Sequence, residues 1–302
     1  MGFRVGRPTG QQHARGAAGH APAATRTRRT RARWLCRPPV WLALVVAFAF
    51  GTAFAISPQN GTPNNNNAPG PLGAVVPDLV TAARSGQDFA GTPAVGALFT
   101  LSDGRLGSHF CTASVINSPN GDLVITAAHC VSGTLDGSVA FVPGYDAGVT
   151  PYGVWTVTAV YVTASWRASA NPDDDVAFLR VSQAGSITPI QDVTGAEQLE
   201  IGAPVRQLVE VIGYPDSSDE AIACQNWTRE PMPDQLEFDC GGYTDGTSGG
   251  PFLASVNPQN GRGTVIGVIG GYEQGGLTPQ VSYAAMFGAD VATLYRQAVA
   301  GG

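Results

Sequence analysis

Residues 246–251 read Gly-Thr-Ser-Gly-Gly-Pro, which places a serine in a glycine-rich stretch suited to a tight turn. Upstream of it, residues 126–130 read Thr-Ala-Ala-His-Cys, and residues 175–179 read Asp-Val-Ala-Phe-Leu. A serine, a histidine and a carboxylate are the three groups that a nucleophilic hydrolase uses. The sequence therefore predicts a hydrolase site, and its catalytic residues are, in chain order, His129, Asp175 and Ser248.

The order of these groups separates three unrelated scaffolds. Residues 246–250 also fit the Gly-x-Ser-x-Gly elbow of α/β-hydrolases, but in that fold the histidine follows the serine. No histidine follows His129 here, and the order of the subtilisins begins with the aspartate. The order His, Asp, Ser is that of chymotrypsin.

Charge is distributed unevenly along the chain. Nine of the 17 basic residues, all arginines, lie within residues 1–37, whereas all 23 acidic residues lie at Asp78 or later. The part after the tail carries eight arginines against 23 acidic residues, a formal charge of −15. Because an acidic body is repelled by nucleic-acid phosphates, we expect no nucleic-acid partner and interpret the basic tail as a targeting element.

An uncharged apolar run of 17 residues, 40–56, follows the basic tail and contains a small-x-small site at 53–55. This arrangement predicts a disordered tail and one hydrophobic helix, which form a signal peptide over residues 1–55. Because the run is only a little shorter than the ~20 residues of a spanning helix, an uncleaved signal-anchor is the alternative. We expect the rest of the protein to be extracellular, with membrane contact only through this segment.

Residues 56–92 begin with a stretch rich in Asn, Pro and Gly, which cannot bury enough apolar surface to order itself. We interpret residues 56–92 as a linker or pro-segment. The part nearest the folded domain, 74–92, fits either a pro-segment or an ordered lead-in.

Four of the five cysteines lie in the exported part, and only Cys36 precedes the hydrophobic segment. An even number of cysteines outside the cell predicts two disulfides, for which three pairings are possible. We favour the two pairings that are local in sequence, Cys111–Cys130 and Cys224–Cys240. No C-x-x-C motif is present in the sequence, so we expect no metal site and no cofactor.

From residue 93 onward, short apolar stretches alternate with turn signals about every ten residues, which predicts an all-β sandwich or barrel. One helix is expected at the end of the chain, about 289–299. Asp290 can cap it, and the apolar residues Val291, Leu294, Tyr295 and Ala298 recur at helical spacing. Examples of the expected strands are 94–101, 111–116, 123–126, 154–162, 176–181, 205–212, 264–269 and 281–286.

The three motifs around His129, Asp175 and Ser248 resemble those of the trypsin/chymotrypsin-like serine proteases, over roughly residues 94–300. The likeness is greatest to secreted bacterial members of the glutamyl-endopeptidase branch. The resemblance implies two six-stranded antiparallel β-barrels with the active site between them, in a protease domain over 93–302. The first barrel would span about 93–190 and the second about 191–286.

The resemblance also implies a role for each residue. His129 is the base that takes the serine proton, since an imidazole titrates near neutral pH, and activity should therefore rise as the ring loses its proton. Asp175 orients that ring, and the N–H groups of Gly246 and Ser248 bind the oxyanion. The rivals are His109 for the base, and Asp173 and Asp174 for the acid, but neither aspartate abuts the apolar strand.

Thr247 departs from the vertebrate pattern, in which an aspartate before the serine pairs with a freed N-terminal ammonium. Thr247 cannot form that ion pair, so we expect activity without a newly cut N-terminus.

The alignment with the family assigns the substrate-binding residues less specifically. Gly242 falls at the base of the primary pocket, where trypsin-like specificity requires a carboxylate. Glutamate-specific relatives use a histidine in the wall of this pocket, and no histidine follows His129 here. We expect a preference for small or apolar residues before the cut. The residues assigned to substrate binding are Gly242, Ile269, Gly270, Gly271, Tyr272 and Val281.

The sequence thus predicts a monomeric serine endopeptidase whose partner is a protein or peptide substrate. The alternatives are an esterase that uses the same triad and a non-catalytic binding or adhesin module on the protease scaffold.

Overall fold

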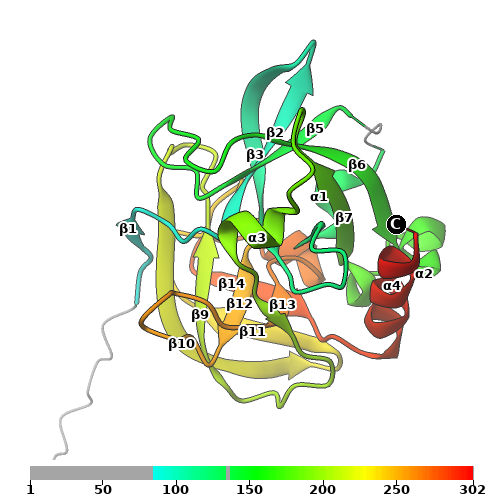
Figure 1. The fold of residues 1–302 in the computed structure, drawn as a ribbon. Helices are drawn as coiled ribbons and strands as arrows, with labels where there is room; N and C mark the ends of the chain where they lie inside the picture. The colour runs from blue at the N-terminus through cyan, green and yellow to red at the C-terminus, as the bar shows by residue number, and fades with distance from the viewer. Residues whose placement is uncertain (1–83, 134–136, 302) are drawn as a thin grey trace, which may run out of the picture. The chain divides into compact units, whose positions relative to one another are not determined.

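In the computed structural model, which describes residues 84–133 and 137–301, strands predominate over a few short helices (Figure 1). The described residues all belong to one unit, Val75–Gly302. The basic tail, the apolar run 40–56, Cys36 and residues 56–83 of the expected linker lie outside the described residues. Within the described part, no helix has the length and hydropathy required to cross a bilayer.

Six strands in the first half of the domain form a closed barrel in the order β2-β3-β4-β7-β6-β5, as expected for the first barrel. All of its neighbouring strands run antiparallel. The strands are β2 (Val95–Ser102), β3 (Arg105–Val115), β4 (Leu123–Thr126), β5 (Val139–Pro143), β6 (Trp155–Val162) and β7 (Ala177–Ser182).

Local sequence explains two features of this barrel. β2 and β3 are joined by the two residues Asp103 and Gly104, whose φ angles of 51° and 72° match a tight hairpin turn that favours Asp-Gly. β4 reads Leu-Val-Ile-Thr and is buried at every position, because it is covered on both faces. It leads directly into the segment that carries His129.

The second sheet differs from the expected six-stranded antiparallel barrel. It has eight strands, in the path β14-β11-β10-β9-β12-β13-β8 with β1 added beside β10, and its β13–β8 pair is parallel. β13 and β14 are not neighbours in this order, and beyond the end of β13 the Gly270 N–H donates to the Tyr283 carbonyl at 3.0 Å. The strands are β1 (Gln87–Phe89), β8 (Gln198–Leu199), β9 (Leu208–Gly213), β10 (Ala221–Met232), β11 (Gln235–Asp239), β12 (Pro251–Ala254), β13 (Thr264–Val268) and β14 (Val281–Ala285).

The two additional strands come from segments that the sequence pattern leaves open. β1 belongs to the stretch before residue 93 and pairs with β10 over three residues, so this end of the stretch is an ordered lead-in to the domain. β8 is only two residues long and follows the connection between the barrels. Neither segment is long enough to show a strand periodicity.

The C-terminal helix α4 (Ala289–Ala300) matches the predicted helix in position and in its buried face, which includes Val291, Leu294 and Ala298. Its N-cap residue is Gly288, so Asp290 lies in the first turn rather than at the cap. Although α4 follows the second sheet, it packs on the first barrel. Tyr295 lies edge-on to Phe178 of β7, and the Tyr295 hydroxyl donates to the Asn117 carbonyl.

The other helical segments are short and lie in the loops between strands. They are α1 (Ala128–Val131), α2 (Ala164–Ser169), α3 (Ile190–Thr194) and the 3-10 turns η1 (Pro172–Asp174) and η2 (Tyr272–Gly275).

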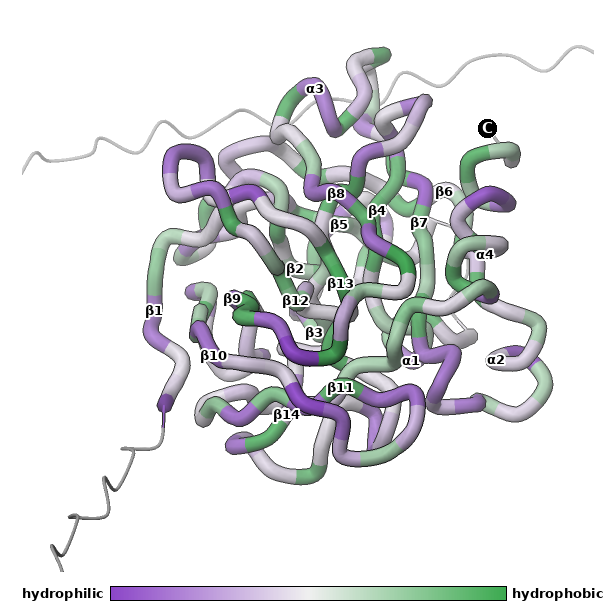
Figure 2. Tube along the Cα trace, turned by 90° about the horizontal axis from the view of Figure 1, so that it is seen from below, coloured by the Kyte–Doolittle hydropathy of each residue, from purple (hydrophilic) through white to green (hydrophobic). Residues whose placement is uncertain are grey.

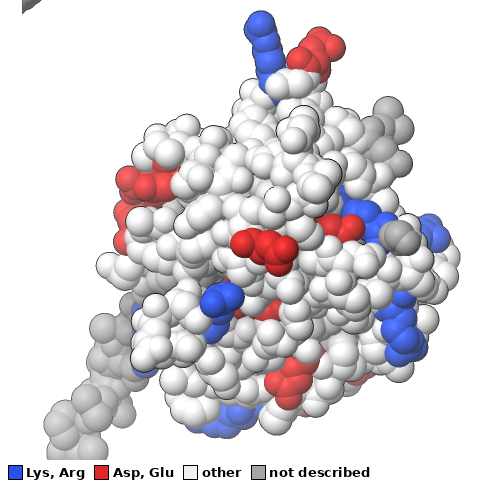
Figure 3. All heavy atoms as spheres, viewed as in Figure 1, with Lys and Arg blue, Asp and Glu red and all other residues white. Residues whose placement is uncertain are grey.

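Hydrophobic residues follow the strands, and hydrophilic residues lie mainly in the connecting loops (Figure 2). The largest buried cluster draws on both sheets, with Ile125 and Phe178 from the first and Ile212 and Leu253 from the second. The face seen in Figure 3 carries scattered charges of both signs without a continuous basic patch. The shared core fixes how the two sheets face each other, and therefore fixes the loops that meet between them.

Candidate active site

His129 lies in the short helix α1, directly after the buried strand β4, and Asp175 lies at the end of the turn η1, directly before β7. Because β4 and β7 are neighbours in the barrel, the two residues meet at the same end of the pair. His129 Nδ1 lies 2.7 Å from Asp175 Oδ2, and the His129 backbone N–H donates to Asp175 Oδ1 at 2.9 Å.

A third donor reaches Asp175 from the second sheet, since the Gly271 N–H donates to Asp175 Oδ2 at 2.9 Å. The carboxylate is 1% exposed. A carboxylate can only accept hydrogen bonds, so the ring proton of a neutral His129 lies on Nδ1 and leaves Nε2 with a free lone pair. That lone pair is what a general base requires.

Neither rival aspartate contacts His129. Asp173 Oδ1 accepts from Gln235 Nε2 at 2.7 Å, and Asp174 Oδ2 accepts from Asn171 Nδ2 at 3.1 Å. Asp174 is buried, not solvated, because the turn η1 folds it inward. His109 lies on β3 among Phe99 and Tyr145, away from the other site residues.

Gln235 joins the aspartate loop to the opposite wall of the site. Its amide nitrogen donates to Asp173, and its amide oxygen accepts from the Tyr272 N–H at 3.0 Å. The sequence gives no signal for this role, because Gln235 is distant from both partners along the chain.

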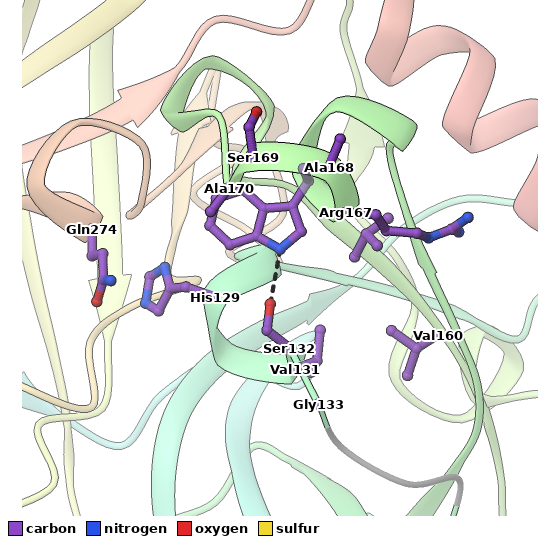
Figure 4. Close-up of a pocket in the computed structure, with 12 residues that line it drawn as sticks. His129, Val131, Ser132, Gly133, Val160, Arg167, Ala168, Ser169, Ala170 and Gln274 are labelled. Carbon is purple, nitrogen blue, oxygen red and sulfur yellow. Dashed lines mark hydrogen bonds between the residues drawn. The ribbon is translucent and has the colours of Figure 1, made fainter.

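Ser248 lies on the loop between Cys240 and β12, and it is half-buried. It lines a cavity of about 260 Å³. His129 lines a neighbouring cavity of about 730 Å³, and Gln274 lines both (Figure 4). The glycine after the serine packs against the chain that precedes the histidine, because a Cβ on Gly249 would lie against Thr126 and 3.1 Å from the Ala127 nitrogen. The two loops are therefore in direct contact, although no hydrogen bond joins the His129 ring to the Ser248 hydroxyl in the described residues.

The larger cavity continues from His129 along α2. Within it, Trp166 Nε1 donates to Ser132 Oγ at 2.8 Å, which ties α2 to the end of α1 (Figure 4).

The backbone before Ser248 leaves two donors unused. Among the described residues, neither the Gly246 N–H nor the Ser248 N–H has an acceptor. Gly246 has a φ of 91°, and a Cβ there would lie 2.6 Å from the Tyr214 carbonyl oxygen. This close approach and the positive φ both require glycine at position 246.

Thr247 is 2% exposed, and its hydroxyl donates to the Thr244 carbonyl at 2.7 Å. The residue that replaces the vertebrate aspartate is therefore satisfied within its own loop.

The residues assigned to substrate binding separate into groups. Ile269 lines the Ser248 cavity, and a Cβ on Gly270 would lie 2.9 Å from Asp175 Oδ2. Tyr272 packs edge-on against Tyr283, and Val281 begins β14. Gly242 is exposed and is not among the residues that line the cavity, and a Cβ there would lie 3.7 Å from Ser85 Oγ.

Sequence reasoning missed most of the cavity lining. One of the residues that it missed is Tyr243, next to Gly242; burial raises the pKa of its phenol, whose hydroxyl donates to the Val211 carbonyl. The other residues that it missed are Thr244, Asp245, Gln274, Gly275, Gly276, Leu277, Thr278, Pro279 and Ser282.

Two disulfides flank the site, in the two sequence-local pairings. Cys111–Cys130 ties β3 to the residue after His129, and Cys224–Cys240 ties β10 to the start of the Ser248 loop. The His129 ring lies near Cys111 and Cys130, but sulfurs joined in a disulfide are not thiolate ligands, so this group does not fit a metal ion.

The arrangement of a His-Asp pair and a serine loop between two β-sheets defines a protein of the serine protease class. The trypsin-like peptidase domain family matches residues 107–268, more than half of the chain, and the chain belongs to this family. The match includes all three residues of the predicted triad.

Solved structures share the fold. The protease Anisep from Arthrobacter nicotinovorans is 24% identical, with a TM-score of 0.61 over 71% of this chain and 99% of that one. The thermostable serine protease AL20 from an extremophilic microorganism is 25% identical, with a TM-score of 0.59 over 70% and 99%. A Glu endopeptidase in complex with MPD is 17% identical, with a TM-score of 0.56 over 72% and 98%. No curated protein sequence matches this chain significantly.

Proposed function

We propose that the protein is an exported serine endopeptidase that cleaves peptide bonds through an acyl-enzyme formed on Ser248. The observation that carries the proposal is the paired contact of Asp175 with both the ring and the backbone of His129, beside the loop that holds Ser248. The two disulfides favour an oxidising, extracellular location.

In the proposed reaction, the Ser248 hydroxyl oxygen attacks the carbonyl carbon of the scissile bond while His129 Nε2 takes the hydroxyl proton. The negative charge that develops on the carbonyl oxygen is bound by the Gly246 and Ser248 N–H groups. The imidazolium then gives its proton to the leaving amine. Water, activated by the same nitrogen, releases the acid product and restores the hydroxyl of Ser248.

We also propose that the Ser248 cavity accepts small or apolar side chains. It has a volume of only about 260 Å³, with Ile269, Leu277 and Pro279 in its lining. No cationic side chain lines it to pair with a glutamate. Asp245 supplies one carboxylate, so a strong preference for Arg or Lys in a peptide-library profile is the result that would refute this specificity.

A fluorophosphonate probe tests the proposed chemistry, because it reacts only with an activated serine. We expect one label per molecule of wild-type protein and none for Ser248→Ala. The unlabelled wild-type protein should cleave an internal bond of a peptide substrate. A folded protein that takes no label is a binding module on this scaffold. A protein that is labelled and cleaves esters but no peptide is an esterase.

A further inference from the structure

One buried threonine of the first barrel holds the loop that carries Ser248. Thr112 lies on β3 and is 0% exposed. Its hydroxyl donates to the Gly246 carbonyl at 3.0 Å, and its backbone N–H donates to the Ser248 carbonyl at 2.7 Å. Thr112 therefore contacts both residues whose N–H groups would bind the oxyanion.

The direction of the Thr112 hydroxyl is fixed by a second bond. The Tyr214 N–H donates to Thr112 Oγ1 at 2.8 Å, which occupies a lone pair of that oxygen. The single hydroxyl hydrogen is then available for the Gly246 carbonyl. One side chain thus connects β3, the segment after β9 and the Ser248 loop in a site that water does not reach.

The peptide group on the other side of Gly246 is held by the same segment. The Asp216 N–H donates to the Asp245 carbonyl at 2.8 Å. In a trans peptide the carbonyl and the following N–H point in opposite directions, so this bond directs the Gly246 N–H away from Asp216. Similarly, the Gly250 N–H donates to the Thr247 carbonyl at 2.9 Å and directs the Ser248 N–H.

Gly246 requires this support on both sides. It has no Cβ, and its φ of 91° lies in a region that glycine enters and leaves easily. Without the Thr112 hydroxyl, the Gly246 carbonyl has no other side-chain donor among the described residues, and the Gly246–Thr247 peptide is held only through the Thr247 N–H, which donates to the Thr244 carbonyl at 3.1 Å. This peptide lies between the two that carry the Gly246 and Ser248 N–H groups, so a tilt of it would displace both donors.

We propose that Thr112 is a positioning residue for the oxyanion site, and that its hydroxyl fixes the Gly246 peptide without the ion pair that Thr247 cannot form. This inference rests on the proposed peptidase function. It assigns to β3 of the first barrel a specific part in aligning donors that belong to the second.

The test compares Thr112→Val, which keeps the shape but removes the hydroxyl, with Thr112→Ser, which keeps the hydroxyl. We expect kcat for a peptide substrate to fall roughly 10- to 100-fold in the valine variant, with KM within about threefold of wild type. The affinity for a peptidyl trifluoromethyl ketone, whose bound form places an oxyanion at the same donors, should fall by the same factor as kcat. Thr112→Ser should stay within about threefold of wild type in both measurements.

Thr228→Val is the matched control. Thr228 on β10 is also 0% exposed, and its hydroxyl also donates to a carbonyl, that of Val205, while it accepts from a backbone N–H, that of Gln207. It loses the same kind of hydrogen bonds away from the Ser248 loop, so its kcat per labelled active site should equal that of wild type. If Thr112→Val does not fold, Thr112→Ser and Thr112→Ala differ only in the hydroxyl and replace the first comparison.

The outcomes are distinct. Wild-type kcat and ketone affinity in a folded Thr112 variant without the hydroxyl would overturn the role of Thr112 and leave the peptidase function intact. The role of Thr112 would also be overturned if the fall in kcat of Thr112→Val disappeared once the rate was divided by the number of fluorophosphonate-labelled sites. An equal fall in kcat in Thr228→Val would overturn it as well. A wild-type protein that takes no label and cleaves no peptide would overturn both proposals.

Discussion

Asp175 holds His129 at two points, because one carboxylate oxygen lies 2.7 Å from the ring nitrogen Nδ1 and the other accepts the backbone N–H. The ring and the chain that carries it are thus oriented by the same group. The contact with Nδ1 sets the tautomer of His129, and the carboxylate that makes it is buried.

Replacing Asp175 with asparagine should therefore disable the base without removing the shape of the site. An amide can donate to Nδ1, which would place the ring proton on Nε2 and leave no lone pair facing the serine. We expect kcat to fall by roughly 10⁴-fold, the effect of this substitution in a Ser-His-Asp protease.

Steady-state kinetics on a peptide substrate measures the effect of Asp175→Asn, and Asp173→Asn is its control, since Asp173 contacts Gln235 and not His129. A loss in Asp173→Asn as large as that in Asp175→Asn would reverse the assignment of the acid.

Gly246→Ala should damage the oxyanion site directly. The added methyl group would lie 2.6 Å from the Tyr214 carbonyl oxygen and against the Asp216 nitrogen, at a φ of 91° that alanine rarely adopts. The loop must then move, and we expect a loss of at least about 10²-fold in kcat, as when one oxyanion donor is removed.

Gly104→Ala separates steric displacement from backbone strain. Gly104 also has a positive φ, 72°, but no atom lies within 4 Å of the Cβ position in its hairpin turn. This variant should lose about 1 kcal/mol of stability in a urea titration and keep its full kcat. Equal kcat values for the two alanine variants would contradict the assigned role of Gly246.

The sequence alone predicts those features that depend on one short, local motif. The motifs around His129, Asp175 and Ser248 predict the family, and residues 289–299 predict α4 within a residue at either end. The alternation of apolar stretches and turns, such as the turn at Asp103 and Gly104, predicts only a sandwich or barrel, and the six strands of the first barrel follow from the family resemblance, since β5 was not among the expected strands.

The features that sequence reasoning missed depend on contacts between distant segments. β1 and β8 are too short for a periodic pattern, and they exist because β10 and β13 offer free edges. Gly242 remains a prediction for the base of the primary pocket; it is exposed beside Ser85 of the lead-in, a segment that the sequence pattern leaves open. Thr112 and Gln235 have ordinary sequence contexts, and only the fold brings them to the site.

Activity should not require a free N-terminus at a specific residue. The Thr247 hydroxyl is satisfied by Thr244, and the chain before β1 already pairs with the second sheet, since the Gly86 N–H donates to the Gly241 carbonyl at 2.7 Å. We therefore expect residues 74–302 with an added N-terminal tag to have the same kcat as the protein after tag removal.

Peptide hydrolysis before and after cleavage of the tag measures this, with fluorophosphonate labelling to count the active sites. An inert tagged form that gains activity on tag removal would show that an N-terminal ammonium is needed after all.

Stability should fall as the pH rises toward neutrality, because of one carboxyl group between the two sheets. Glu197 is 0% exposed, its backbone pairs with Ile116 of the first barrel, and its Oε2 accepts the Gly263 N–H of the second. Its Oε1 has no partner among the described residues. Burial raises the pKa of Glu197 to about 7, and the Gly263 N–H and nearby Arg262 only partly oppose this.

Because the folded-state pKa of Glu197 lies above that of the unfolded chain, the unfolded state gives up this proton first as the pH rises. The contribution to stability is complete below about pH 4.5 and is lost as the pH passes through 7. Glu197→Gln cannot ionise, so its free energy of unfolding relative to the parent should increase between pH 4.5 and 8, by an amount on the order of 3 kcal/mol. Urea titrations at several pH values in a Ser248→Ala background, which prevents self-cleavage, measure this difference. Glu200→Gln, in which an exposed carboxyl is replaced, should follow the parent at every pH. A constant difference between Glu197→Gln and its parent from pH 4.5 to 8 would show that Glu197 keeps its charge in the folded protein.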